Sequence, residues 1–380
     1  MDRPADVVVV GGGLIGTAIA WRLQTAGLQV TVVTGERAAA ASGVAAGMLA
    51  PVTEISFTEE LLLGLNLASM ELYGDFADEL EEASGLPAGL RRTPTLSVAA
   101  NADDAARLAV LSSYLDRLGL ASARLTSREC RTQEPLLSPS IRSGLLVEAD
   151  WSCDNRLLWA ALVEGARRSG VLEAPGFVHA VRSSVGRVTG VTLADGTELD
   201  AGRVVLANGA WASQIGGVPP VPVRPVKGQI LRLDPGRLPQ PGSTIRAISK
   251  GTEVYLVPRG TGREVVVGAT VEEQGFDATV TAGGVYELLR DARSVVPMTA
   301  EYRLAETSVG WRPATPDNAP ILGGCELAGL LLATGHYRNG VLLTPVTALA
   351  ITELVITGEL PPVARDFRLE RFSARLEPVQ

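Results

Sequence analysis

The feature that most constrains this chain is a glycine-rich turn between two strongly apolar segments near its N-terminus. Residues 6–10 (DVVVV) are typical of a strand buried on both faces of a parallel sheet. The turn GGGLIG follows, then a helical segment that ends at Gly27, and residues 28–33 (LQVTVV) predict a second buried strand. The sequence therefore predicts a strand–turn–helix–strand unit and an α/β fold around a parallel sheet.

The turn carries three glycines with the spacing of a dinucleotide site. Gly11, Gly13 and Gly16 match G-x-G-x-x-G between the predicted strand and helix. In such a site the first glycine permits the tight turn, the second lets a pyrophosphate approach the backbone, and the third allows close helix–strand packing. Gly-rich turns are common, but this placement favours dinucleotide binding over a purely structural turn, with the phosphate on the helix N-terminus.

The segment after the second strand indicates which dinucleotide is bound. That strand ends at Thr34, where an acidic residue usually holds the adenosine ribose, so the ribose contact falls either to Glu36 or to Thr34 and the backbone. Residues 38–51 (AAAASGVAAGMLAP) form a turn of small residues rather than leading directly into a helix. This turn leaves room for the second half of an extended cofactor, which favours FAD over NAD.

Composition narrows the class of protein. The 380 residues predict two or more domains, and a net charge of −8 with 4% aromatic residues disfavours a nucleic-acid partner. No apolar run is long enough for a membrane span, and the N-terminus has no signal-peptide pattern, so we expect a cytoplasmic protein. Three widely spaced cysteines, Cys130, Cys153 and Cys325, fit neither a disulfide framework nor a zinc site, and we expect no metal.

The rest of the chain alternates between helical patterns and strand patterns. Helical patterns cover residues 59–82, 102–118, 154–169 and 282–294, with Asp154 as a helix cap, and strand patterns fill residues 227–270. Asp195-Gly196 predicts a hairpin turn. We therefore expect a discontinuous Rossmann-like FAD-binding domain of residues 1–84, 143–218 and 304–380. Residues 85–142 and 219–303 would form an antiparallel-sheet α+β substrate-binding domain.

Six segments carry a family resemblance. They are VVVVGGGLIGTAIAWRL, ASGVAAGMLAP, YLVPRG, VGATVEEQGFD, GWRPATPDNAPILG and TGHYRNGVLLTPVTA. Together they resemble the glycine oxidase branch of the D-amino-acid oxidase superfamily, which serves thiamine biosynthesis, over about residues 6 to 357. The resemblance implies the D-amino-acid oxidase and glutathione-reductase-like architecture, non-covalent FAD, and oxidative deamination of glycine and small amines such as sarcosine or D-alanine. The expected products are the imine or glyoxylate, ammonia and hydrogen peroxide, with oxygen as acceptor and iminoglycine supplied for the thiazole of thiamine. A homotetramer is also implied.

The same resemblance assigns cofactor contacts. Besides Gly11, Gly13 and Gly16, it implies FAD contacts at Leu14, Ile15, Thr34, Gly35, Ala41, Ser42, Ala46, Gly47, Met48, Val178, His336, Tyr337, Arg338, Asn339, Gly340, Val341 and Leu342. The covalent flavin attachment of a related sarcosine oxidase branch lies ahead of the segment matching DNAPILG. Cys325 follows that segment and is expected to be unattached.

Two further residues, Arg312 and Tyr255, are expected to bind or act on the substrate together with Arg338. Arg312 would hold the substrate carboxylate in a bidentate grip, and Tyr255 would donate a second hydrogen bond to it. Arg338 would line the substrate pocket, and a helix beginning near Leu342, with Pro345 in its first turn, would point its positive end at the reduced flavin. Glu253 either influences the protonation of the amine or is only solvated.

Two alternatives remain open from the sequence. The chain could be a related D-amino-acid or sarcosine oxidase, or a dehydrogenase that passes electrons to an acceptor other than oxygen. It could also be a non-catalytic flavin-binding protein. Only two histidines and no G-x-S-x-G motif are present, which argues against a serine hydrolase.

Overall fold

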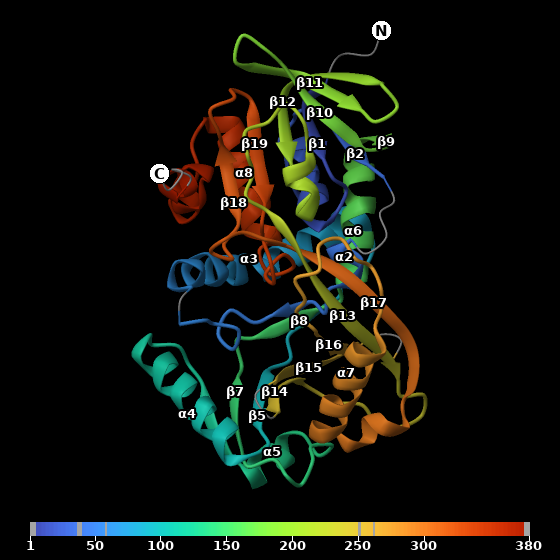
Figure 1. The fold of residues 1–380 in the computed structure, drawn as a ribbon, viewed down its shortest axis with the longest axis vertical. Helices are drawn as coiled ribbons and strands as arrows, with labels where there is room; N and C mark the ends of the chain where they lie inside the picture. The colour runs from blue at the N-terminus through green and yellow to red at the C-terminus, as the bar shows by residue number, and fades with distance from the viewer. Residues whose placement is uncertain (1–4, 36–39, 58, 250–251, 261–262, 376–380) are drawn as a thin grey trace.

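The predicted strand–turn–helix–strand unit forms at the start of the computed structural model, which describes residues 5–35, 40–57, 59–249, 252–260 and 263–375. Strand β1 (Ala5–Val10) leads through the glycine turn into helix α1 (Leu14–Thr25) and then strand β2 (Val30–Thr34). The two strands are parallel, with Val8 opposite Thr31. The unit forms the centre of the first of two large sheets (Figure 1).

The first sheet is mainly parallel. Strands β19 (Leu330–Thr334), β12 (Glu198–Leu206), β1, β2 and β9 (Leu172–Pro175) run side by side in the same direction. Strand β18 (Ile321–Gly324) is antiparallel to β19, and strands β10 (Val178–Ser184) and β11 (Arg187–Leu193) form a hairpin beside the first half of β12. Thr192 of β11 pairs with Glu198 of β12, so the hairpin predicted at Asp195-Gly196 is confirmed.

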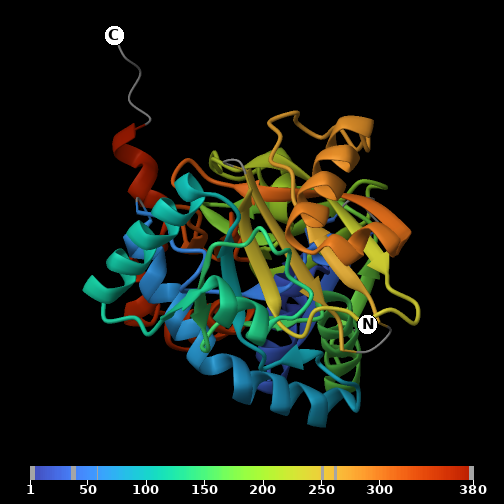
Figure 2. The same cartoon turned by 90° about the horizontal axis from the view of Figure 1, so that it is seen from below.

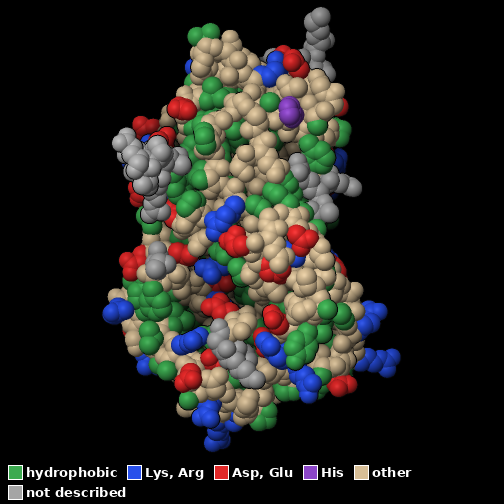
Figure 3. Space-filling model, viewed as in Figure 1, with side chains coloured by type: hydrophobic (Ala, Val, Ile, Leu, Met, Phe, Trp, Pro, Cys, Tyr) green, Lys and Arg blue, Asp and Glu red, His purple; other side chains and the backbone are tan. Residues whose placement is uncertain are grey.

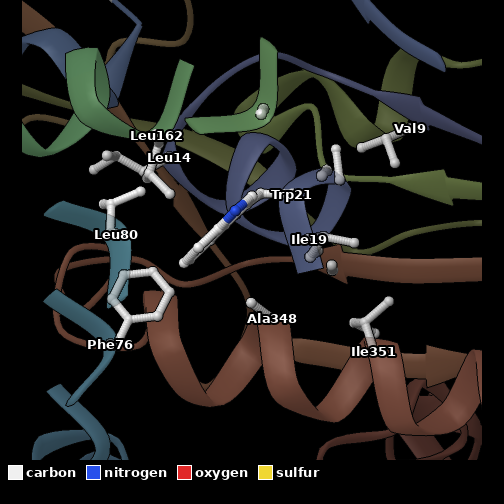
Figure 4. Packing of buried hydrophobic residues seen from close by; sticks show 14 of the residues in the cluster. Val9, Leu14, Ile19, Trp21, Phe76, Leu80, Leu162, Ala348 and Ile351 are labelled. Carbon is white, nitrogen blue, oxygen red and sulfur yellow. The ribbon is translucent and has the colours of Figure 1, made fainter. Parts of the chain in front are cut away.

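Four helices cover one face of this sheet: α1, α3 (Glu60–Ser84), α6 (Asn155–Ser169) and α8 (Thr344–Thr357). The valines of β1 alternate, so that Val7 and Val9 pack against the helices while Val8 and Val10 pack on the opposite face. Figure 4 shows Trp21 of α1 pointing toward Phe76 of α3, with ring centroids 5.7 Å apart. Burial of such side chains, each contributing about 1.5–3 kcal/mol, fixes the helix that carries the glycine turn.

The second sheet lies below the first in Figure 1 and is antiparallel except between β5 and β14. Its strands in order are β17 (Arg303–Ala314), β13 (Arg224–Asp234), β16 (Val265–Gly268), β15 (Thr252–Pro258), β14 (Thr244–Ser249), β5 (Thr95–Ala99), β7 (Ser143–Val147) and β6 (Ala123–Thr126). Helix α7 (Ala282–Val295) contacts β13 to β16, and helix α4 (Ala102–Arg117) contacts β5 and β7 (Figure 2). The predicted fold class, a parallel-sheet α/β part combined with a mostly antiparallel α+β part, is confirmed.

The sheets divide the chain differently from the predicted domain limits at two places. Strand β7 pairs with β5 and β6, and β17 pairs with β13 along most of its length, so both belong to the second sheet. Limits at residues 143 and 304 would assign them to the FAD-binding part. Strand patterns in the sequence show that a segment is buried, but they carry no information about which sheet it joins.

The remaining elements are short. A third sheet contains β3 (Met48–Leu49), β8 (Trp151–Cys153) and β4 (Leu90–Arg91), and short helices occur at α2 (Ala41–Val44) and α5 (Ser127–Gln133). Short 3-10 helices are η1 (Gly209–Gln214), η2 (Pro297–Glu301), η3 (Pro362–Phe367) and η4 (Leu369–Arg375). The described part of the segment after Pro361 is ordered against the first sheet, because Phe367 and Phe372 are buried there.

Candidate active site

A cavity of about 1880 Å³ lies between the two sheets. The carboxyl ends of the five parallel strands open into it, which is the usual position of a ligand in an open α/β sheet. Lining residues from these ends are Gly11, Thr34, Pro175, Ala207 and Thr334, and the opposite wall comes from β14, β15 and β17. The hollow is visible in the space-filling view between the upper and lower halves of the molecule (Figure 3).

The glycine turn has the conformation that its sequence requires. Gly11 has φ 111°, and a Cβ there would lie 2.7 Å from the carbonyl oxygen of Ala207. A Cβ on Gly16 would lie 1.9 Å from the carbonyl oxygen of Gly11, so only glycine lets α1 pack this closely on the turn. Leu14 and Ile15, in the first turn of α1, line the cavity, and the positive end of the helix therefore faces it.

A chain of hydrogen bonds connects the glycine turn to the second sheet. The N–H of Leu14 donates to Ser42 Oγ at 3.0 Å, and the Asn155 side-chain amide donates to the Ser42 carbonyl oxygen at 2.7 Å. Arg259, which directly follows β15 and is 1% exposed, donates to Asn155 Oδ1 at 2.9 Å. The buried, charge-assisted contact from Arg259 holds Asn155, and Asn155 in turn fixes the position of Ser42 beside the turn.

Thr34 and two aromatic residues shape the cavity beside the glycine turn. A Cβ on Gly12 would lie 2.4 Å from Thr34 Oγ1, and the Phe177 ring is so close to Gly35 that a Cβ there would be 2.6 Å from its edge. The indole N–H of Trp159 donates to the Gly12 carbonyl oxygen at 2.9 Å. Glu36, one of the two candidates for the ribose contact, lies outside the described residues.

Tyr255 and Arg312 are brought together at the far end of the cavity. Arg312 Nη1 donates to the carbonyl oxygens of Thr270 at 3.1 Å and Lys227 at 3.4 Å, and its guanidinium lies over Gly228. Burial raises the pKa of Tyr255, and the adjacent Arg312 charge opposes this shift. Within the described ranges, Arg312 forms no ion pair with a carboxylate. Its charge is therefore available to an anion in the cavity.

Arg338 and His336 lie in the loop before α8. Arg338 Nη2 is 3.2 Å from Glu59 Oε2, and although burial lowers its pKa, the carboxylates of Glu54 and Glu59 raise it overall. His336 Nε2 is 3.0 Å from Thr347 Oγ1, and burial lowers its pKa to about 3. His336 is therefore a neutral hydrogen-bonding residue of the loop.

Comparison with known proteins identifies the family. The model of the FAD dependent oxidoreductase family (DAO) matches residues 6–354. The chain belongs to this family. A glycine oxidase from Geobacillus kaustophilus is 35% identical to this chain, with 98% of each chain covered. The solved structure of glycine oxidase from that species superposes with a TM-score of 0.87 at 33% identity, and the superposition covers 97% of this chain and 98% of that one. The bifunctional protein ThiO/ThiG of Synechocystis sp. is 36% identical over 100% of this chain, which spans 56% of that protein's length.

The residues around the cavity fit the FAD of this family. The glycine turn leaves no room for a side chain between α1 and the end of β1, and the positive end of α1 suits a pyrophosphate. Of the expected FAD contacts, those that line the cavity are Gly11, Gly13, Leu14, Ile15, Thr34, Gly35, Ala41, Ser42, Ala46, Gly47, Met48, Val178, His336, Tyr337, Arg338, Gly340 and Val341. Their individual roles toward FAD stay predictions.

Three expected contacts lie behind the cavity wall. Gly16 packs against the Gly11 carbonyl, and its contribution is to helix packing. Asn339 and Leu342 are both buried away from the cavity. The chain turns tightly before α8, because the Leu343 N–H donates to the Asn339 carbonyl and the Leu342 carbonyl accepts from Ser69 Oγ. Asn339 and Leu342, three residues apart, therefore face the protein core.

Several lining residues were missed by sequence reasoning. They are Glu54, Trp159, Glu173, Phe177, Asn208, Trp211, Gln229, Arg246, Thr270, Glu272, Glu287 and Trp311. Asn208 and Trp211 directly follow a predicted parallel strand, and that position could have identified them. Arg246 lies opposite Tyr255 in the pairing of β14 with β15, and no sequence pattern predicts that register.

The cysteines are consistent with a non-covalent cofactor. Cys130 and Cys153 are buried, Cys325 is partly buried, and none of the three lines the cavity. Burial raises the pKa of Cys153 to about 12 and that of Cys130 to about 11, so both are unreactive thiols.

Over the part of the chain that the structure describes, no helix is both long and apolar enough to cross a membrane.

Proposed function

We propose that this chain is an amine oxidase that deaminates glycine and small amines such as sarcosine or D-alanine. In the proposal the products are the imine or glyoxylate, ammonia and hydrogen peroxide, and iminoglycine is supplied for the thiazole of thiamine. The observation that carries it is Arg312, a guanidinium held by two backbone carbonyls, facing the cavity beside Tyr255 and without a carboxylate partner in the described chain. The names of the relatives, glycine oxidase and ThiO/ThiG, support it.

In the proposed reaction, FAD and the residues around the cavity have separate roles. When bound, FAD accepts two electrons from the substrate. Arg312 and Tyr255 would hold the substrate carboxylate, which fixes the position of the adjacent carbon and amine. Arg338 and the positive end of α8 would stabilise negative charge near the loop of residues 336–343. His336, with a pKa of about 3 and a hydrogen bond to Thr347, is not the proton acceptor at neutral pH.

The experiment compares peroxide release from glycine, sarcosine and D-alanine by the purified FAD-bound protein. Arg312→Lys keeps the charge but loses the planar fork, so we expect kcat/KM to fall roughly 10- to 150-fold, equivalent to about 1.5–3 kcal/mol for a lost charged hydrogen bond. Arg365→Lys, at an arginine outside the cavity lining, is the matched control. Equal activity of both variants would refute the assigned role of Arg312.

Anaerobic addition of glycine separates the two alternatives. Bleaching of the flavin absorbance without peroxide release in air would indicate a dehydrogenase with another acceptor. Bound FAD that none of the amines bleaches would indicate a non-catalytic flavin-binding protein.

A further inference from the structure

Three charged side chains line the cavity beside Tyr255. Arg246 of β14 lies opposite Tyr255 of β15, and Glu253 is two residues before Tyr255. The side chains of Arg246, Glu253 and Tyr255 therefore share one face of the sheet. Glu54, from the turn after β3, reaches the same region. Glu54, Arg246 and Glu253 are called the charged cluster below. Figure 3 shows acidic and basic side chains gathered around this hollow.

The guanidinium of the charged cluster is already engaged. Arg246 Nη2 lies 3.3 Å from Glu253 Oε2 and 3.7 Å from Glu54 Oε1, and Nη1 donates to the Thr53 carbonyl oxygen. A second anion entering the cavity would therefore have to displace a carboxylate of the protein to bind Arg246. Arg246 is unlike Arg312, which has no such partner in the described chain.

The net charge around the substrate end is negative once Arg312 is assigned to the substrate. The charged cluster contributes two carboxylates and one guanidinium, and the nearby pair of Arg338 with Glu59 is neutral. Over these five side chains the sum is one unit of negative charge facing the incoming substrate. Glu54 and Arg246 side chains are only 13% and 14% exposed, so their charges are weakly screened, whereas Glu253 is 68% exposed.

The position of Glu54 is fixed by a buried carboxylate. Asp150, fully buried, accepts the N–H groups of Val52 at 3.0 Å and Thr53 at 2.7 Å, and the Glu54 N–H donates to the Ala50 carbonyl at 3.1 Å. The turn that carries Glu54 cannot move away easily when a ligand of like charge enters.

We propose that the charged cluster selects the substrate class, with Glu54 as its main determinant: it admits amines with one carboxylate and rejects those with a second carboxylate on the nitrogen substituent. This inference rests on the proposed amine oxidase function. The carboxylate held by Arg312 and Tyr255 is accepted, and an additional carboxylate meets net negative charge with no free guanidinium beside it.

The test uses two substrates of nearly equal size. N-(Carbamoylmethyl)glycine and iminodiacetate have the same number of non-hydrogen atoms and differ mainly in the charge of the nitrogen substituent, and the readout is the ratio of their kcat/KM values. We expect wild-type protein to favour N-(carbamoylmethyl)glycine at least about tenfold. Glu54→Gln should reduce this preference about tenfold, the effect expected from removing one partly buried unit charge. Glu253→Gln is the matched control at an exposed carboxylate, with a smaller reduction. Arg246→Gln should increase the preference, because it leaves the carboxylates uncompensated.

A binding measurement tests the inference even if the variants fold poorly or the protein oxidises none of the amines. Diglycolate monoamide and diglycolate are non-oxidisable counterparts of the two substrates, and each is titrated into FAD-bound wild-type protein while the flavin absorbance is followed. Tighter binding of the monoamide, by about tenfold or more, supports the charged cluster as the selector. Equal or tighter binding of diglycolate overturns the inference, as does an unchanged kcat/KM ratio in Glu54→Gln. Selective binding without oxidation of any amine refutes the proposed function and leaves the selectivity standing.

Discussion

His336 and Asp150 are buried groups whose pKa values are shifted in ways that give opposite effects of pH on stability. Burial lowers the pKa of His336 from 6.5 to about 3, so the unfolded chain binds a proton first as the pH falls. Burial raises the pKa of Asp150 from 3.8 to about 6, despite hydrogen bonds from Thr53 and Val52, so the native chain binds a proton first. Acidification therefore removes stability through His336 and adds it through Asp150.

The two effects nearly cancel in the wild-type protein. From about pH 6 to pH 4, His336 lowers the free energy of unfolding by about 2.5 kcal/mol, and Asp150 raises it by about 2 kcal/mol. Asp150→Asn removes the compensation, so its stability should fall by about 2 kcal/mol more than that of wild type over this interval. His336→Gln should change in the opposite direction, gaining about 2.5 kcal/mol relative to wild type.

Urea unfolding followed by circular dichroism, with FAD in fixed excess, measures these differences. Each variant is compared with wild type at the same pH, so that the exposed carboxylates common to all three proteins cancel. Curves of free energy against pH that stay parallel for wild type and both variants would show that neither group titrates as its burial requires, and the reasoning would fail.

Three further predictions concern single contacts. Gly16→Ala should weaken FAD binding at least about tenfold, measured by flavin fluorescence, because its Cβ would lie 1.9 Å from the Gly11 carbonyl oxygen and displace α1; unchanged affinity would contradict this packing. Asp154→Ala removes a carboxylate that caps α6 by accepting two backbone N–H groups, and it should cost about 1 kcal/mol in the free energy of unfolding; a loss near zero would count against the cap. Cys325→Ser should keep the full amount of flavin, and acid precipitation should release all flavin from the wild-type protein, since this thiol does not line the cavity; flavin remaining with the precipitate would indicate a covalent bond.

Local patterns in the sequence predict the elements of the expected FAD site well. The valines of β1 and the glycines of the following turn specify their structure through contacts within about 30 residues. The cap at Asp154 was predicted for the same reason, because a helix start depends on the residues immediately around it.

Features that depend on contacts between distant segments were not predictable in this way. The register that places Arg246 opposite Tyr255, and the choice of sheet by β7 and β17, depend on pairing between segments that local periodicity does not specify. Asn339 and Leu342 are buried away from the cavity because of a tight turn, and the sequence pattern of the GHYRNG segment does not predict this turn.

Strand β17 has a consequence for engineering. It pairs with β13 in the lower half of the molecule and ends, past Arg312, beside the loops of the upper half (Figure 1). The chain also crosses between the halves several times, so a single splice junction cannot exchange one half with that of a relative. A functional chimera would have to transplant several segments at once, including the whole of this strand with its partner.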